Sequence, residues 1–211
     1  MDKTEPGKKG HFPTKPAVTD IAPEQAIDFE QWKHRPPYQI QSPDEFGEAK
    51  WSGSCQCGQV TYKIRQEKPL IAKYCHCHGC QVMHGAPFQW SAVFCKPDIC
   101  FVKGAEGLTF YSSSHRTKEY EAPTKVSCSF CKSPIMDEGR NMCLVFPELI
   151  TIGDSDEEHS AWRRAFEPIC HIYYCRRVME VLDGKPKWAG MDDDSELMDD
   201  NGNILKSEDE D

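Results

Sequence analysis

Seven cysteines fall into three short motifs, and their spacing constrains the fold more than any other feature of this 211-residue chain. The motifs are Cys55-Gln56-Cys57, Cys75-His76-Cys77-His78-Gly79-Cys80 and Cys128-Ser129-Phe130-Cys131. A chain of this length can bury a core without disulfides. The N-terminus shows no apolar segment typical of a signal peptide, so we expect a reducing, cytoplasmic setting in which clustered thiols bind metal.

Two of the motifs supply a pair of thiols each. Zinc takes thiolate ligands at about 2.3 Å in tetrahedral geometry, and two closely spaced pairs close such a site. We therefore predict a structural zinc held by Cys55, Cys57, Cys128 and Cys131. It would join the first strand region to a hairpin about seventy residues later in the chain.

The middle motif supplies three thiols, from Cys75, Cys77 and Cys80. Three thiolates hold zinc on three sides and leave a fourth position for water or substrate, as catalytic sites do. Such an ion carries a net charge of −1, which favours capture of an incoming thiol over generation of hydroxide. Alternatively, His76, His78 or His84 supplies the fourth ligand and this second zinc is also structural.

Several other side chains are candidates for roles at this site. His76, His78 and His84 could move a proton, because histidine titrates near neutral pH. Glu138 could act as a base and Arg140 as an anion anchor if either faces the site. The remaining cysteines are predicted to be small buried packing residues, namely Cys95, Cys100, Cys143, Cys170 and Cys175.

Short apolar segments between Gly, Pro and Ser turns predict a mainly β fold of small antiparallel sheets around the zinc knuckles. The expected strands are residues 59–64, 88–94, 99–102, 108–111 and 142–146. A helix is expected after Asp156 and before Pro168, and another short one at residues 24–32. The Pro36-Pro37 pair predicts extended chain over residues 35–47.

Charge and proline content divide the chain into three parts. Residues 1–47 are proline-rich and predicted to be partly disordered, residues 48–190 form the zinc domain, and residues 191–211 form a disordered acidic tail. That tail carries the whole formal charge of −9. The near-neutral body has no basic stripe for nucleic acid. No apolar run is long enough to span a membrane.

The motifs and their flanks resemble the family of glutathione-dependent formaldehyde-activating enzymes and centromere protein V. The resemblance covers about residues 48–190, and the sequence is most similar to fungal members. It rests on the segments Gly53–Tyr62, Lys73–Cys80, Gly85–Trp90, Cys128–Pro134 and Met136–Met142.

The resemblance implies a β-tent fold and the same division into a structural and a catalytic zinc, two ions per chain. It also implies a carbon–sulfur lyase reaction that links glutathione and formaldehyde, with glutathione as co-substrate. Two positions depart from the family pattern, because Gln81 stands where many members have Arg and Lys132 where many have Gly. Loss of the arginine puts recognition of the glutathione carboxylates in question.

The leading hypothesis is therefore a zinc-dependent carbon–sulfur lyase or transferase whose partner is a small thiol or thiol adduct. One alternative is a non-catalytic zinc module that binds another protein, for which the acidic tail would suit a basic partner. Another is an enzyme of secondary metabolism acting on a different thiol conjugate. A homo-oligomer is compatible with the sequence, which does not specify one.

Overall fold

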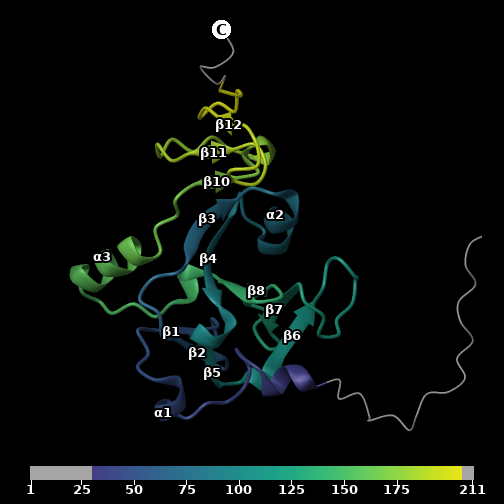
Figure 1. Cartoon of the computed structure of the whole chain (residues 1–211), viewed down its shortest axis with the longest axis vertical. Helices are drawn as coiled ribbons and strands as arrows, with labels where there is room; N and C mark the ends of the chain where they lie inside the picture. The colour runs from purple at the N-terminus through teal and green to yellow at the C-terminus, as the bar shows by residue number, and fades with distance from the viewer. Residues whose placement is uncertain (1–29, 206–211) are drawn as a thin grey trace, which may run out of the picture.

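A computed structural model describes residues 30–205 of the chain, and β-strands dominate it (Figure 1). The strands are β1 (Trp51–Ser54), β2 (Thr61–Ile64), β3 (Ile71–Cys75), β4 (Gln89–Cys95), β5 (Ile99–Lys103), β6 (Leu108–Tyr111), β7 (Thr124–Cys128), β8 (Pro134–Glu138), β9 (Met142–Val145), β10 (His171–Ile172), β11 (Lys187–Trp188) and β12 (Leu197–Met198).

Helices are few and short. The α-helices are α1 (Pro43–Phe46), α2 (His78–His84) and α3 (Asp156–Ala165), and the 3-10 helices are η1 (Gln31–His34), η2 (Lys96–Asp98), η3 (Ala105–Gly107), η4 (Pro147–Leu149) and η5 (Tyr174–Arg176). None of the helices in the described residues is long and apolar enough to cross a membrane.

The strands form two sheets. The smaller sheet has the order β1-β2-β5, and the larger has the order β12-β11-β10-β3-β4-β9-β8-β7-β6. All pairings are antiparallel except those of β10 with β3 and with β11, which are parallel. The predicted mainly β, antiparallel class is confirmed, and the five strands expected from residue patterns correspond to β2, β4, β5, β6 and β9.

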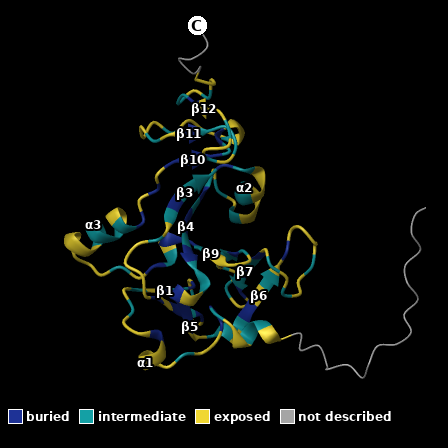
Figure 2. Ribbon diagram, viewed as in Figure 1, coloured by how far each residue is buried: buried dark blue, intermediate teal, exposed yellow. Residues whose placement is uncertain are grey.

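The core lies between the two sheets, where the inward faces of the strands are buried (Figure 2). Ile64 and Ala92 are fully buried there, and Phe94, Phe101 and Val145 are 1% exposed. Three of the cysteines expected as packing residues, Cys100, Cys143 and Cys170, are buried as predicted, Cys95 is half-buried and Cys175 is exposed.

Two of the α-helices begin with a capping box, so the local sequence explains where they start. Ser155 caps α3 by accepting the Glu158 N–H, and the Glu158 side chain accepts the Ser155 N–H in return. α1 begins the same way at Ser42, with Glu45 as the reciprocal partner. The expectation of purely extended chain over residues 35–47 was therefore wrong at α1, because the capping box outweighs the extended bias of the preceding prolines.

At the N-terminal side, the predicted helix over residues 24–32 lies mostly outside the described residues. Its described end enters the 3-10 helix η1. Tyr38 and Phe46 are buried, so this segment packs on the body as the sequence suggested.

Residues 191–205 differ from the predicted disordered tail, because they are placed against the body. β12 pairs with β11, and the Asp192 carboxylate lies 2.5 Å from the amine of Lys73. The Asp200 carboxylate lies 2.7 Å from the amine of Lys187, whose side chain is 1% exposed. Acidic residues that were predicted to lie in a solvent-exposed tail therefore neutralise lysines of residues 48–190. Residues 206–211 lie outside the described part.

Candidate functional site

Four cysteines meet where the turn between β1 and β2 faces the turn between β7 and β8. The sulfur atoms of Cys55, Cys57, Cys128 and Cys131 all lie within 4.8 Å of one another. Cys57 Sγ is 3.4 Å from Cys55 Sγ and 3.9 Å from Cys128 Sγ. Ligands at 2.3 Å from a tetrahedral zinc stand about 3.8 Å apart, so this group fits a closed zinc site.

Backbone geometry holds the two turns in register. Gln56 N–H donates to Ser133 Oγ at 3.2 Å, which joins the first turn directly to the second. Lys132 has φ of 62°, in the left-handed region that glycine adopts more readily. The lysine therefore keeps the turn conformation at the position where the sequence departs from the family pattern.

A second group contains the sulfur atoms of Cys75, Cys77 and Cys80, which also lie within 4.8 Å of one another. Cys75 ends β3, Cys77 precedes α2 and Cys80 lies in its first turn. Cys77 Sγ accepts the Cys80 N–H at 3.4 Å. Within residues 30–205, no fourth histidine, cysteine or acidic residue joins this group.

The three thiols differ in acidity because they interact with one another. Hydrogen bonds from the Cys75 and Cys80 thiols lower the pKa of Cys77, assisted by the backbone N–H groups of Cys80 and Gly79. The same interaction with Cys77 raises the pKa of Cys75. The Cys80 pKa is raised by Cys75, while the nearby Lys125 ammonium acts in the opposite direction. Cys77 is therefore the first of the three to become a thiolate, the form that binds metal.

The three predicted histidines have three different environments. His78 is exposed at the start of α2. His84 ends α2 and is half-buried, with its ring edge-on to Phe146 at 4.8 Å. His76 is fully buried, and its Nε2 lies 2.8 Å from Nδ1 of His171. The sequence motif alone did not separate these three roles.

His76 is the first member of a buried chain of polar groups. Asp183 accepts a hydrogen bond from His171 Nε2 at 2.9 Å and another from the Lys187 amine at 3.1 Å. A carboxylate on Nε2 of His171 leaves its Nδ1 as an acceptor, so His76 donates from Nε2. His76 Nδ1 is then an unprotonated nitrogen, and it is buried without a hydrogen-bond partner among the described residues.

A cavity of about 240 Å³ lies beside the three-thiol group. Its walls come from the end of α2, the start of β4 and the segment after Cys131, and include His84, Phe88, Gln89 and Trp90. Gln89 pairs with Cys75 across the β3–β4 ladder, which sets the cavity against the cluster. His84 Nε2 and Gln89 Oε1 are both buried without partners in the described chain, so the cavity holds polar atoms free for a ligand.

Two lysines lie next to this cavity. His84 also lines an adjoining cavity of about 170 Å³, which Lys125 and Lys132 share. Lys125 forms an ion pair with Asp137, which also accepts a hydrogen bond from Gln89 Nε2. The exposed Lys132 leaves positive charge on this side of α2.

Gln81, the departure from the arginine of many family members, has a structural role. Its side-chain amide donates to the carbonyl oxygens of Pro87 at 3.1 Å and Arg176 at 2.9 Å. These bonds tie α2 to the following loop and to η5. Gln81 carries no charge, and the cations near this end of α2 are Lys125 and Lys132.

The structure does not bring Glu138 and Arg140 to the three-thiol group. Glu138 pairs with Cys143 and accepts hydrogen bonds from Tyr38 and Tyr120, both at 2.6 Å, so its carboxylate is already occupied. Arg140 lines a different cavity. The possibility that either residue faces the site was wrong. Successive side chains of a strand point to opposite faces, so Asp137 of β8 contacts Gln89, whereas Glu138 contacts Tyr38 and Lys96 on the other side.

Sequence reasoning missed several residues of the site. Residue patterns gave Asp183 and Lys187 no role, and Gln89 was included only as a member of the expected strand over residues 88–94. The only sequence signal for Gln89 was its place in a strand that closely follows the CxCxxC motif. No local pattern marked Asp183, because its partner His171 is brought to it by the parallel pairing of β10 with β11.

Comparison with known proteins gives one strong match. The family described as glutathione-dependent formaldehyde-activating enzyme matches residues 50–176, which contain all seven clustered cysteines. No curated protein matches the chain significantly. Among solved structures, a Rhodobacter sphaeroides protein is similar, with 22% identity over 51% of this chain and 94% of that one, and a TM-score of 0.40.

Proposed function

The chain belongs to the family of glutathione-dependent formaldehyde-activating enzymes, and from this we propose that it is a zinc-dependent carbon–sulfur lyase or transferase. Its proposed substrate is a thiol adduct of the S-hydroxymethylglutathione type. The observation that carries the proposal is the group of Cys75, Cys77 and Cys80, which offers three thiolates and no fourth ligand within residues 30–205. A position open to substrate is typical of catalytic zinc sites.

The donor sets suit the two metal roles. Cys55, Cys57, Cys128 and Cys131 would hold a structural zinc, since four thiolates close its coordination. Cys75, Cys77 and Cys80 would hold the catalytic one. Zinc bound by these three residues would lower the pKa of a substrate thiol, so that the sulfur is nucleophilic at neutral pH.

The reaction balances without a further reactant. In the direction of synthesis, the glutathione sulfur loses its proton and forms a bond to the formaldehyde carbon. The electron pair of the carbonyl π bond moves to oxygen, which takes up a proton and becomes the hydroxyl group of the adduct. Cleavage is the reverse, so the chain needs one group that removes a proton and one that returns it.

The proposed proton-transfer group is His84. Burial lowers its pKa, so the ring is neutral near pH 7. Its Nε2 lines the 240 Å³ cavity without a partner among the described groups, and Gln89 lies beside it. We assign His84 Nε2 as the proton acceptor and Gln89 Oε1 as the group that orients the hydroxyl of the adduct.

Other residues of the cavity bind the substrate and keep water out. Phe88 and Trp90 provide apolar walls that exclude solvent from the reacting atoms. Lys132 offers a positive charge for the carboxylates of glutathione, and Lys125 offers a second one that Asp137 partly neutralises. This recognition replaces the arginine that many members have after the CxCxxC motif.

The test uses zinc-loaded full-length protein with glutathione and formaldehyde, and the uncatalysed formation of the adduct is measured as the background rate. Exchange spectroscopy by NMR measures the rate at which free formaldehyde and adduct interconvert. We expect saturable acceleration by wild type, loss of that acceleration in Cys77→Ala, and no change in Cys175→Ser, where the altered cysteine is exposed and lies outside both groups.

The alternatives give different outcomes. Acceleration with another thiol but not with glutathione would favour a thiol conjugate of secondary metabolism as substrate. Full zinc loading without acceleration for any thiol would contradict the enzyme and favour a protein-binding zinc module. A closer relation to fungal members, the cytoplasmic location, the lack of a nucleic-acid partner and the state of oligomerisation stay predictions.

A further inference from the structure

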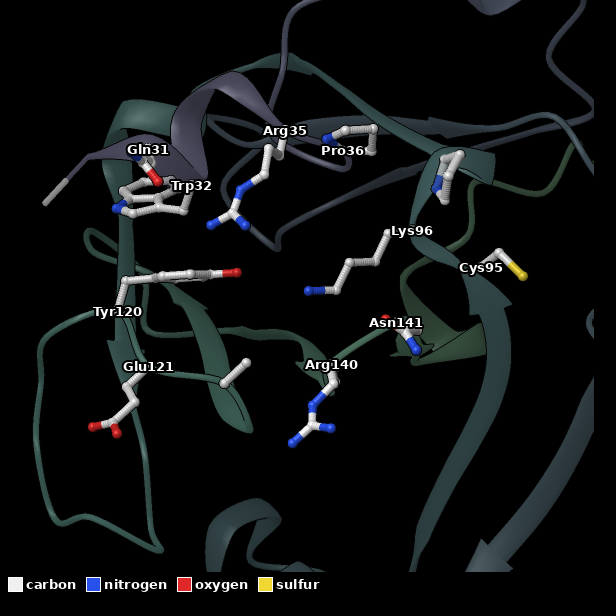
Figure 3. A pocket seen from close by; sticks show the side chains of 12 residues that line it. Gln31, Trp32, Arg35, Pro36, Cys95, Lys96, Tyr120, Glu121, Arg140 and Asn141 are labelled. Carbon is white, nitrogen blue, oxygen red and sulfur yellow. The ribbon is translucent and has the colours of Figure 1, made fainter. Parts of the chain in front are cut away.

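A cavity walled by none of the seven clustered cysteines lies on another part of the fold. Its volume is about 840 Å³, within the range of sites for small molecules. Four separate segments wall it, those around η1, the end of β4 with η2, the stretch at residues 120–122, and the turn between β8 and β9 (Figure 3). The hollow is open to solvent on one side, and its walls come from segments that are distant in the sequence.

Three cations line this cavity. Figure 3 shows Arg35 on one side, Arg140 on the opposite side and the amine of Lys96 directed into the space between them. The Lys96 charge is balanced by an ion pair with Glu138. Arg35 and Arg140 are exposed, and neither guanidinium has a hydrogen-bond or ion-pair partner among residues 30–205.

The nearby acidic groups do not neutralise the two arginines. Glu138 lies under the cavity, 1% exposed, and its oxygens accept from Tyr38, Tyr120 and Lys96. Glu121 lies with a carboxylate oxygen 2.8 Å from His115 Nδ1, and its carboxylate points away from the hollow in Figure 3. The described walls therefore carry an excess of positive charge.

The aromatic wall is rigid. Trp32 stacks on Tyr120 with ring centroids 5.2 Å apart and meets Phe110 edge-on at 4.7 Å. Tyr120 is in turn held by its hydrogen bond to Glu138. Such a wall is organised before a ligand arrives, and a preorganised site loses less conformational entropy on binding.

The cavity is separate from the proposed catalytic group. β4 begins at Gln89, which pairs with Cys75, and ends at Cys95, which lines the cavity. Seven residues of strand span about 20 Å. One part of the wall, residues 31–36, precedes the region that matches the family, residues 50–176, and the other lining segments lie within it.

We propose that this cavity binds a small organic anion. Its carboxylate or phosphate group pairs with the guanidinium groups of Arg35 and Arg140, since a guanidinium can donate two hydrogen bonds to either kind of oxyanion. Its apolar body packs against Trp32 and Tyr120 and the adjoining prolines. The inference is independent of the proposed lyase activity, because it rests on none of the seven clustered cysteines.

The test is isothermal titration calorimetry on the zinc-loaded full chain with three probes. Adenosine 5′-monophosphate carries a phosphate, 2-naphthoate carries a carboxylate, and adenosine is an uncharged control. We expect saturable binding of at least one anion with Kd below about 1 mM. Binding of the phosphate probe alone, or of the carboxylate probe alone, identifies which oxyanion the site prefers.

Two double variants decide where the anion binds. Arg35→Gln/Arg140→Gln should weaken binding at least about tenfold, the usual effect of losing charge-assisted hydrogen bonds. Lys63→Gln/Arg163→Gln removes the same charge from exposed positions on β2 and α3 and should leave Kd unchanged. The proposal is overturned if neither anion binds, if adenosine binds as tightly as its monophosphate, or if both double variants bind alike.

Discussion

His76 and His171 lie 95 residues apart in the sequence, yet their ring nitrogens Nε2 and Nδ1 are 2.8 Å apart and both side chains are fully buried. The parallel pairing of β10 with β3 brings them together, with Ile172 opposite Cys75. The C-terminal part of the chain therefore fixes the orientation of a histidine inside the CxCxxC motif. It does so through Asp183, which accepts from His171 at 2.9 Å.

Replacing Asp183 with asparagine should destabilise the protein by about 1–3 kcal/mol at pH 7, because buried donors of His171 and Lys187 lose a charged acceptor. Burial opposes ionisation of Asp183, but hydrogen bonds led by that from His171 prevail and lower its pKa to about 2. A lowered carboxyl pKa stabilises the fold above the usual value of 3.8, and this contribution is lost as pH falls towards 2. Urea unfolding followed by circular dichroism measures the difference.

The matched control for this variant is Asp154→Asn, an exposed aspartate just before α3. It should change the unfolding free energy by less than about 0.5 kcal/mol. Equal stability of the two variants would mean that the polar chain from His76 to Asp183 does not stabilise the fold.

Gly104→Ala should be strongly destabilising, by roughly 2–4 kcal/mol, because a Cβ atom there would lie 2.2 Å from the backbone oxygen of Gln59. Gly85→Ala is the control, since Gly85 shares the left-handed conformation of Gly104, with φ 58° and ψ 34°, but nothing lies within 4 Å of its added Cβ. It should cost only about 1–2 kcal/mol from the left-handed backbone. Thermal unfolding that shifts equally in both would contradict the close approach at Gly104.

Glu138→Gln should cost about 3 kcal/mol, because it leaves the half-buried Lys96 amine without its carboxylate partner. It also weakens the hydrogen bonds from Tyr38 and Tyr120, which anchor the N-terminal segment. Chemical denaturation of this variant beside Glu106→Gln, an exposed glutamate in η3, measures the effect. A cost no larger than that of the control would refute the buried pairing.

Removal of zinc should proceed in two steps. The group around Cys55 and Cys128, both 1% exposed, is closed and ties two turns together. The group around Cys77 lies at the start of a short helix and offers three ligands. We expect a chelator to remove the second ion first with little loss of secondary structure, and the first ion only with unfolding. Zinc release and circular dichroism are recorded together during chelation. Loss of both ions in a single step would contradict this prediction.

Spacing along the chain predicted the two cysteine groups because their members lie on short turns, where local geometry brings them together. Strands such as β4 and β9 followed from runs of apolar and β-branched residues. The pairing of four cysteines across about seventy residues needed only the general preference of zinc for four thiolates.

Contacts between segments that are distant in the sequence could not be predicted from local residue patterns. Asp192 and Asp200 looked like members of a solvated charge run, but Lys73 and Lys187 need them as partners. No sequence pattern indicated that the ring of Trp32 stacks on that of Tyr120, since the two residues lie on separate segments. Glu138 and Arg140 follow one another closely in sequence, and only the fold shows which faces the core and which a surface cavity.

The most direct test of the central claim is whether a thiol binds at the group of Cys75, Cys77 and Cys80. Cobalt(II) replaces zinc in thiolate sites and reports sulfur binding through its visible and near-ultraviolet absorption. With both sites loaded, glutathione should increase the sulfur-to-cobalt absorption of the wild type in a saturable way, and should not change that of Cys77→Ala. An unchanged wild-type spectrum at saturating glutathione, or an equal change in the variant, would contradict an open metal position that receives the substrate sulfur.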